Sequence, residues 1–359
     1  MSTLGPYRVS PVGLGLMSFT WCEPSDYTPD AQAFEVIKTA IDKARPDERV
    51  VLNSCTIYGP PSDPFANISL LRRFFARYPE LKDRVVLVVK GGAKIGEYRA
   101  KGLAGLSYSA TLENLREEVT ELRKHLGSDI DGLPLHFYGI GRRDLSLTVE
   151  ETITNLHTLQ KEGLFEHIAL SELGVDSINQ AAAAAQKLGT KIGSLELEYS
   201  PFCRDIERNG ALTACKKHGI PVLAYSPLGK GFLSGKLKDR SEVPKHDLRN
   251  HLEGFSDENF AKNVELATTF ADLASSFSIN ATPAQLALAW LVKQGDAANI
   301  SIIPIPGTTK PARAAENMGA QDVGMDEETV QLVASQTEDK EMRGGRYNAW
   351  MRSTGLLFA

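Results

Sequence analysis

Short apolar runs alternate with amphipathic segments along most of this chain. Such runs are typical of strands that are buried on both faces, as in a parallel sheet. The predicted strands lie at residues 12–16, 50–54, 85–90, 135–140, 167–170, 192–198, 221–225 and 300–305. Alternation of strands with helices indicates a parallel sheet with right-handed crossovers.

The segments between these runs place apolar residues three and four positions apart, which is the spacing of one helix face. The clearest helix covers 111–126 and stops at Gly127, and Asp30 is the expected N-cap of the first helix. The predicted helices lie at residues 31–44, 66–78, 111–126, 149–162, 176–188, 206–218, 258–278, 282–294 and from Pro311 onward. Eight strand–helix units predict the α/β class and a closed (β/α)8 TIM barrel, whose chemistry lies at the C-terminal face of the strands.

Composition narrows the classes of function. The 359 residues are 42% hydrophobic and 24% charged, which suits a large core, and the net charge of −5 argues against nucleic acid or an anionic membrane as partner. No apolar stretch approaches the ~20 residues that span a bilayer, and the first residues do not resemble a secretory signal. The four cysteines and seven histidines show no disulfide or metal-ligand spacing. We therefore expect no metal, a reducing compartment and a cytoplasmic location.

A lysine and a tyrosine end two neighbouring predicted strands. Lys90 follows the apolar run 85–89, and Tyr58 lies on the loop that leaves the strand 50–54. An ammonium beside a phenol lowers the pKa of the phenol, and such a tyrosine can donate a proton to a carbonyl oxygen near neutral pH. The alternative for either residue alone is structural, as an anchoring lysine and a packing tyrosine.

Six segments in order, each at the end of a predicted strand, together resemble the aldo-keto reductases over nearly the whole chain. They are Asn53 to Tyr58-Gly59, Lys90, 169–172, 196–200, 224–229 and 305–317. A finer resemblance, to the fungal pyridoxal reductases, rests on Asn53 in place of the family's aspartate and on 198–210, 260–263 and 344–348. The resemblance implies hydride transfer between a nicotinamide and a carbonyl group.

The resemblance further implies that Tyr58 donates the proton and that Lys90 tunes it. Asn53 can accept a hydrogen bond from the ammonium but brings no negative charge. Less neutralisation would strengthen the effect of Lys90 on Tyr58, yet a buried unpaired ammonium also loses its proton more easily. Both outcomes stay open at this point.

The catalytic histidine of the family has two candidate positions in this chain. The usual spacing from the preceding aspartate selects His136, whereas alignment backward from Arg142 places Gly141 there. The second register needs no gap on its C-terminal side and is the one we favour. His136 would then be a histidine packed within a strand.

The resemblance implies a dinucleotide cofactor. Its expected ligands are Ser171, Glu196, Tyr225, Ser226, Pro227, Leu228, Gly229, Gly307, Thr308, Lys310, Arg313, Glu316 and Asn317. Ser171 and Glu196 would bind the carboxamide, and Tyr225 would stack on the ring. Lys310 and Arg313 flank a helix start, which is a natural phosphate site, so we expect NADPH. Taken alone, these two would be an ordinary first-turn lysine and an exposed arginine.

Three further residues are candidates for the aldehyde pocket: Met17, Trp21 and Tyr347. Aromatic residues are as often plain core, so their type alone does not assign them. We expect one domain over 1–359, in which residues 325–359 form a C-terminal helix and tail near the substrate pocket.

The leading hypothesis is an NADPH-dependent aldehyde reductase that converts pyridoxal to pyridoxine. The alternatives are a broad carbonyl reductase, a reductase of another pathway aldehyde, and a cofactor-binding regulatory subunit with little turnover. A small-molecule aldehyde would be the partner, and the protein would be a monomer or a small homo-oligomer.

Overall fold

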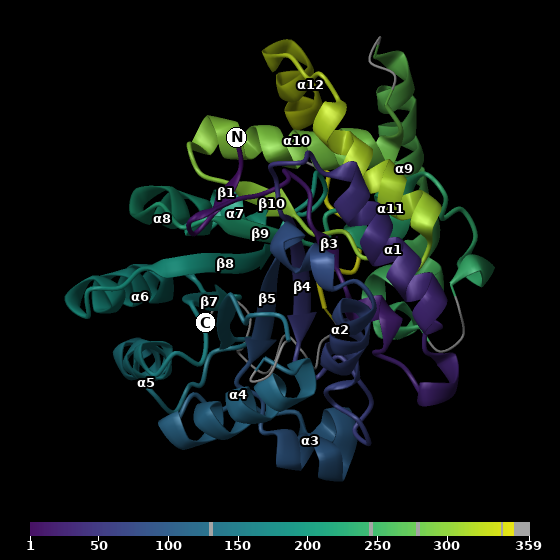
Figure 1. Cartoon of the computed structure of the whole chain (residues 1–359). Helices are drawn as coiled ribbons and strands as arrows, with labels where there is room; N and C mark the ends of the chain where they lie inside the picture. The colour runs from purple at the N-terminus through teal and green to yellow at the C-terminus, as the bar shows by residue number, and fades with distance from the viewer. Residues whose placement is uncertain (129–131, 244–246, 278–280, 339, 348–359) are drawn as a thin grey trace.

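Eight parallel strands form one curved sheet within the described residues, and each strand pairs with the next along the chain. The structure is a computed structural model that describes residues 1–128, 132–243, 247–277, 281–338 and 340–347. The strands are β3 (Leu14–Gly15), β4 (Val50–Cys55), β5 (Val85–Gly91), β6 (Phe137–Ile140), β7 (His167–Ser171), β8 (Ile192–Glu198), β9 (Val222–Tyr225) and β10 (Ile302–Pro304). The predicted eight strands are thus confirmed (Figure 1).

The first and last strands of this sheet meet and close the barrel. Gly13 N donates to Pro304 O at 2.9 Å, and Gly15 N donates to Pro306 O at 3.2 Å. A Cβ atom on Gly15 would lie 2.8 Å from the carbonyl oxygen of Ile305. Only glycine permits this close approach of two backbones. The predicted (β/α)8 TIM barrel is therefore confirmed.

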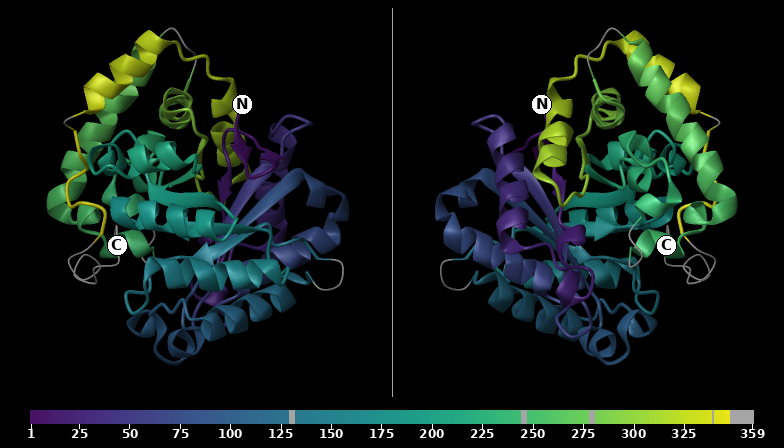
Figure 2. Two further views of the ribbon diagram at one scale, coloured as in Figure 1. Left: turned by 90° about the vertical axis from the view of Figure 1, so that its left-hand side faces the viewer. Right: turned by 90° about the vertical axis from the view of Figure 1, so that its right-hand side faces the viewer.

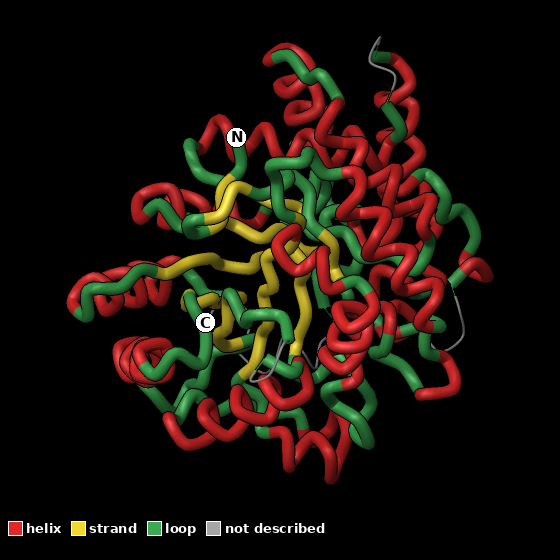
Figure 3. Tube along the Cα trace, in the orientation of Figure 1, coloured by secondary structure: helices red, strands yellow, loops and turns green. Residues whose placement is uncertain are grey.

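Helices cover the outside of the strands, as Figures 2 and 3 show from several directions. They are α1 (Asp30–Lys43), α2 (Ala66–Arg77), α3 (Ile95–Lys101), α4 (Leu112–Leu126), α5 (Val149–Lys161), α6 (Val175–Lys187), α7 (Asp205–Arg208), α8 (Ala211–His218), α9 (Asp257–Ser276), α10 (Pro283–Ala298), α11 (Pro311–Met318) and α12 (Glu327–Thr337). A search of the described helices finds none that combines the length and the apolar character needed to cross a membrane.

The core has two layers because successive side chains of a strand point to opposite faces. Outward residues such as Leu52, Leu87 and Val89 pack against the helices. Inward residues such as Val51 and Val86 fill the barrel together with Val88, Phe137, Leu223 and Ile303. Both sets are almost completely buried.

The structure differs from the sequence prediction at four places. The predicted helix 206–218 is divided into α7 and α8, and Gly210 between them has a φ of +86°. Asp30 lies inside α1 instead of capping it, because both of its carboxylate oxygens accept hydrogen bonds from Arg73, at 2.7 and 2.8 Å. The sequence reading also missed α3 and an antiparallel hairpin of β1 (Thr3–Leu4) and β2 (Tyr7–Arg8).

Candidate active site

Strand alternation brings polar side chains to the carboxyl-end mouth of the barrel. In β5, Val86 and Val88 point into the barrel, so Lys90 at the end of the strand points inward as well. Asn53, Ser171 and Tyr225 point inward for the same reason, because each lies two residues after an inward side chain, namely Val51, Ala169 and Leu223. Glu196 points inward because it pairs in register with Leu223 of the neighbouring strand. Residues far apart in the chain therefore meet at one mouth.

Lys90 is held by a buried network at this mouth. Its Nζ atom donates to Asn53 Oδ1 at 2.8 Å, to Glu196 Oε2 at 2.9 Å and to Ser54 O at 3.3 Å. Asn53 Nδ2 donates to the same carboxylate oxygen of Glu196 at 2.7 Å. Lys90 and Glu196 are only 7% and 5% exposed. The expectation that Asn53 leaves the ammonium poorly neutralised is therefore wrong, because Glu196 supplies the charge from across the barrel.

This ion pair decides the charge state of Lys90. Burial is the largest single effect and would lower the pKa of Lys90. The attraction and hydrogen bond of the Glu196 carboxylate, together with smaller effects of Tyr58 and Cys55, outweigh burial and hold that pKa above its usual value. One oxygen of Glu196 is thus already occupied by two donors. Glu196 thus contacts Lys90 and Asn53, two partners that the sequence did not predict for it.

Tyr58 lies beside the ammonium, as expected. Lys90 Nζ is 5.2 Å from the centroid of the Tyr58 ring. Burial raises the pKa of Tyr58 more than Lys90 lowers it, so the net shift is upward, not downward as the sequence suggested. The phenol consequently keeps its proton at neutral pH and remains a donor. The Trp21 ring lies 5.6 Å from the Tyr58 ring, and Met17 in the short helix after β3 is 39% exposed.

His136 lies toward the other end of the barrel. Its Nδ1 atom accepts from Leu87 N at 3.1 Å, and its ring packs edge-on against Tyr7 at 5.2 Å. Lys90 pairs in register with Gly139, three residues further along. Burial lowers the pKa of His136 to about 4. The candidate catalytic role of His136 is therefore corrected: it is a neutral, buried histidine away from the mouth.

Gly141 is the residue that lies beside Lys90. Its N–H donates to Gly91 O at 2.7 Å. A Cβ atom on Gly141 would lie 3.7 Å from Lys90 Cβ and 3.4 Å from a ring carbon of Tyr108. The ring of Tyr108, which the sequence reading missed, takes up the space toward which a side chain at 141 would point.

The ends of β7 and β9 carry features that suit a nicotinamide cofactor. The Ser171 hydroxyl is buried and has no hydrogen-bond partner among the described residues, so a carboxamide could satisfy it. Glu172, Ser226 and Lys230 have positive φ values of 56°, 48° and 56°. Strained backbone of this kind in non-glycine residues is concentrated at functional sites. After β9, Ser226 O accepts from Gly229 N at 2.9 Å, and the turn between them contains Pro227 and Leu228.

The segment before α11 presents free positive charge. Thr308 Oγ1 accepts from Lys310 N at 3.1 Å, which shapes the turn into the helix. Lys310 and Arg313 are exposed and make no ion pair with the rest of the described chain. Glu316 pairs with Lys236, and nearby Gly307 bridges to Gly15 while Asn317 is buried. The two free cations fit a phosphate group.

The C-terminal tail is fastened across the mouth. Arg346 donates to Glu172 Oε1 at 2.6 Å and to Glu198 Oε2 at 2.9 Å, and both carboxylates are buried. Tyr347 and Tyr225 share a hydrogen bond between their hydroxyls at 2.6 Å. Of these tail residues, sequence reasoning found only Tyr347. The pairing of Arg346 could not be recognised, because its partners come from two distant strands.

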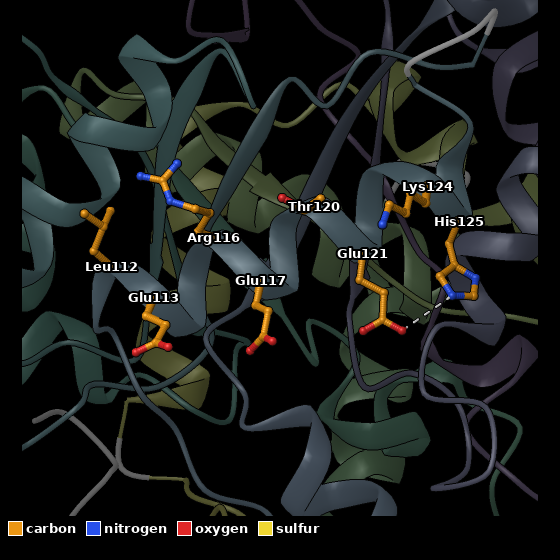
Figure 4. A pocket seen from close by; sticks show the side chains of 8 residues that line it. All are labelled: Leu112, Glu113, Arg116, Glu117, Thr120, Glu121, Lys124 and His125. Carbon is orange, nitrogen blue, oxygen red and sulfur yellow. Dashed lines mark ion pairs between the residues drawn. The ribbon is translucent and has the colours of Figure 1, made fainter.

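One surface hollow lies along α4, away from this mouth. Its lining consists of Leu112, Glu113, Arg116, Glu117, Thr120, Glu121, Lys124 and His125, all from α4 (Figure 4). A hollow lined by one helix alone is a surface feature, so we do not assign chemistry to it. No group of three metal-ligating side chains was found in the described part of the chain.

Comparison with known proteins agrees with this geometry. The profile of the aldo/keto reductase family matches residues 11–338. The chain is 30% identical over 358 residues to a Schizosaccharomyces pombe protein named "probable pyridoxal reductase 2", with 99% of each chain covered. It is 35% identical over 226 residues to an S. pombe aldo-keto reductase whose name specifies NADP(+), with 62% of each covered.

The fold is also found among solved structures. A glycerol dehydrogenase from Gluconobacter oxydans superimposes with a TM-score of 0.74 at 19% identity, covering 95% of this chain and 94% of the other. With the barrel, the lysine and tyrosine at its mouth and the profile match over most of its length, this chain belongs to the aldo/keto reductase family.

Proposed function

We propose that this protein reduces an aldehyde to an alcohol with NADPH, that pyridoxal is its preferred substrate, and that Tyr58 is the proton donor. The observation that carries the proposal is the Lys90 ammonium, fixed by Asn53 and Glu196 at 5.2 Å from the Tyr58 ring. The choice of pyridoxal is supported by the name of the full-length fungal relative.

NADPH, when bound, supplies a hydride to the carbonyl carbon. The former carbonyl oxygen then gains negative charge and needs a donor aimed at it. Tyr58 donates its hydroxyl proton there, which completes the alcohol, and the ammonium of Lys90 stabilises the phenolate that remains. Glu196 keeps Lys90 protonated and in place.

The preference for NADPH over NADH is supported by Lys310 and Arg313. Both are exposed, and neither makes an ion pair with the other described residues. Arginine offers bidentate hydrogen bonds to a phosphate, which only NADPH carries on its adenosine ribose. Ser171 would receive the carboxamide at the other end of the cofactor, because its buried hydroxyl has no partner in the described chain.

We further propose that the barrel and its tail act as one domain in the cytoplasm. The tail supplies Arg346 and Tyr347 to the mouth, so the site depends on it. All four cysteines are free, which supports a reducing compartment.

The test is the loss of NADPH absorbance with purified protein and pyridoxal, compared with 4-nitrobenzaldehyde and with NADH as cofactor. We expect turnover of pyridoxal with NADPH, and a fall of ~100- to 10,000-fold in kcat for Tyr58→Phe, the range for a lost positioned acid. Tyr78→Phe, at the end of α2, is the matched control. Turnover by Tyr58→Phe at more than about a third of the wild-type rate would remove Tyr58 from this role.

A further inference from the structure

Arg142 stands at the mouth of the barrel, directly after Gly141 at the end of β6. It is half-buried, and its guanidinium donates to Gly141 O at 2.7 Å and to Tyr347 Oη at 3.3 Å. The guanidinium also interacts electrostatically with Tyr108, Tyr225 and Glu172. Arg142 is thus surrounded by the elements that form the candidate site.

Arg142 differs from the other cations of the mouth. Lys90 pairs with Glu196, Lys230 pairs with Glu198, and Arg346 pairs with both Glu172 and Glu198. Within the described residues, no carboxylate comes within ion-pair distance of Arg142. A guanidinium has five N–H donors, and only two hydrogen bonds are seen here.

A half-buried cation without a counter-ion is costly, and an anionic ligand would remove that cost. The position of Arg142 indicates which ligand this is. The guanidinium contacts Tyr347 Oη and interacts electrostatically with Tyr108, whose ring lies against Gly141 beside Lys90. We therefore place the guanidinium at the end of the mouth where the carbonyl group would react. The exposed Lys310 and Arg313, by contrast, lie at the start of α11.

We propose that Arg142 binds a negatively charged oxygen on the aldehyde, so that the substrates of this site are aldehydes that carry a carboxylate, phosphate or phenolate group. This inference rests on the proposed function and adds the substrate class to it. Arginine suits the role because its planar fork matches an oxyanion with two parallel hydrogen bonds. Pyridoxal, whose ring hydroxyl is acidic, belongs to this class.

The test compares acids with their neutral esters in the full-length protein with NADPH. The substrates are 3- and 4-carboxybenzaldehyde and their methyl esters, which share the reacting group and differ in charge. The quantity is the ratio of kcat/KM for the acid to that for the ester. Arg143→Gln is the matched control, because the guanidinium of Arg143 donates instead to Ser177 Oγ on α6, at 3.2 Å.

We expect the wild type to prefer at least one acid over its ester, mainly through KM. Arg142→Gln should lower this preference by about 10- to 150-fold, the effect of one hydrogen bond to a charged group. Arg143→Gln should keep the wild-type ratio. Should Arg142→Gln fail to fold, Arg142→Lys keeps the charge but not the fork and should lower the ratio partially.

Two outcomes would overturn the inference. They are a wild type without preference for either acid and an unchanged ratio in the Arg142 variants. An unchanged ratio together with a loss of NADPH affinity would assign the guanidinium to a cofactor phosphate.

A binding measurement separates this inference from the proposed function. Calorimetric titration of 4-carboxybenzyl alcohol and its methyl ester, with NADPH present, requires no turnover, because neither the alcohol nor NADPH can accept a hydride from the other. Absence of turnover with every aldehyde would count against the proposed function, whereas equal affinities for acid and ester would count against the role of Arg142.

Discussion

Replacing Glu196 with glutamine tests the charge balance around Lys90. Glutamine keeps the size of the side chain and an acceptor oxygen but removes the negative charge. At the observed 2.9 Å, two unit charges attract by about 6 kcal/mol at an effective dielectric constant of 20. Because the cost of burying both charges offsets part of this, we expect Glu196→Gln to lower the free energy of unfolding by ~3–5 kcal/mol, as when one partner of a buried pair is removed.

The assay is urea unfolding at pH 7, followed by circular dichroism, in two backgrounds. In Lys90→Met protein the carboxylate keeps its hydrogen bond from Asn53 but is a buried charge without a cation beside it, so Glu196→Gln should there be neutral or stabilising. Glu162→Gln, which breaks an exposed pair with Arg116, is the control and should cost only ~0–1 kcal/mol. Equal destabilisation by Glu196→Gln in both backgrounds would refute the reasoning.

The pH dependence gives a second check on the same pair. In the wild type the pKa of Lys90 is raised, so its contribution to stability is complete below the ordinary lysine pKa and is lost only at strongly alkaline pH. In Glu196→Gln burial is no longer offset, and the pKa of Lys90 should fall. The folded variant then releases its proton before the unfolded chain does, so the stability deficit should shrink as the pH rises from 7 to 9.

Three other predictions concern the cofactor, His136 and the backbone of β6. Arg313→Ala should weaken NADPH binding ~10- to 150-fold, as expected for a lost hydrogen bond to a charged group, and leave NADH binding nearly unchanged in fluorescence titrations; equal losses would contradict a phosphate contact. Burial lowers the pKa of His136 to about 4. As the pH falls below the ordinary histidine pKa of ~6.5, the unfolded chain therefore binds this proton before the folded chain does. His136 should thus lower the free energy of unfolding by ~3 kcal/mol at pH 4. An acid-unfolding profile unchanged in His136→Gln would contradict this. Gly139→Ala should prevent normal folding, because its Cβ atom would lie 1.5 Å from Ala169 O. Gly141→Ala should fold, because its closest contact would be at 3.4 Å. Equal melting temperatures for the two variants would be evidence against the described packing.

The barrel could be predicted from the sequence because its signals are local. The run 85–89 and the turn that follows it identify a buried strand without knowledge of any other part of the chain. The same holds for the helix 111–126, which the structure ends at Leu126. The start of the first helix was predicted wrongly because of a contact with a distant residue. The Asp30 carboxylate, expected to cap this helix, instead accepts hydrogen bonds from Arg73.

The candidate site was harder because its decisive contacts are long-range. Lys90 and Tyr58 come from neighbouring strands, and sequence spacing alone suggested that they meet. Glu196 reaches Lys90 from a strand more than 100 residues later, and no local pattern distinguishes a counter-ion from a cofactor ligand. Arg142 was used only as an alignment marker, since its lack of a partner becomes visible only when all surrounding elements are in place.

The contact between Gly15 and Ile305 that closes the barrel has a consequence for folding during synthesis. The first barrel strand cannot pair on this side until the last one is made, because its partners at Pro304 and Pro306 are synthesised about 290 residues later. At ~5–20 residues per second this delay is on the order of 15–60 s. During that time the nascent sheet has two unpaired edges, which can pair with other chains. The incomplete barrel is therefore open to wrong pairing until residues 304–306 are made, and slower translation would lengthen that period.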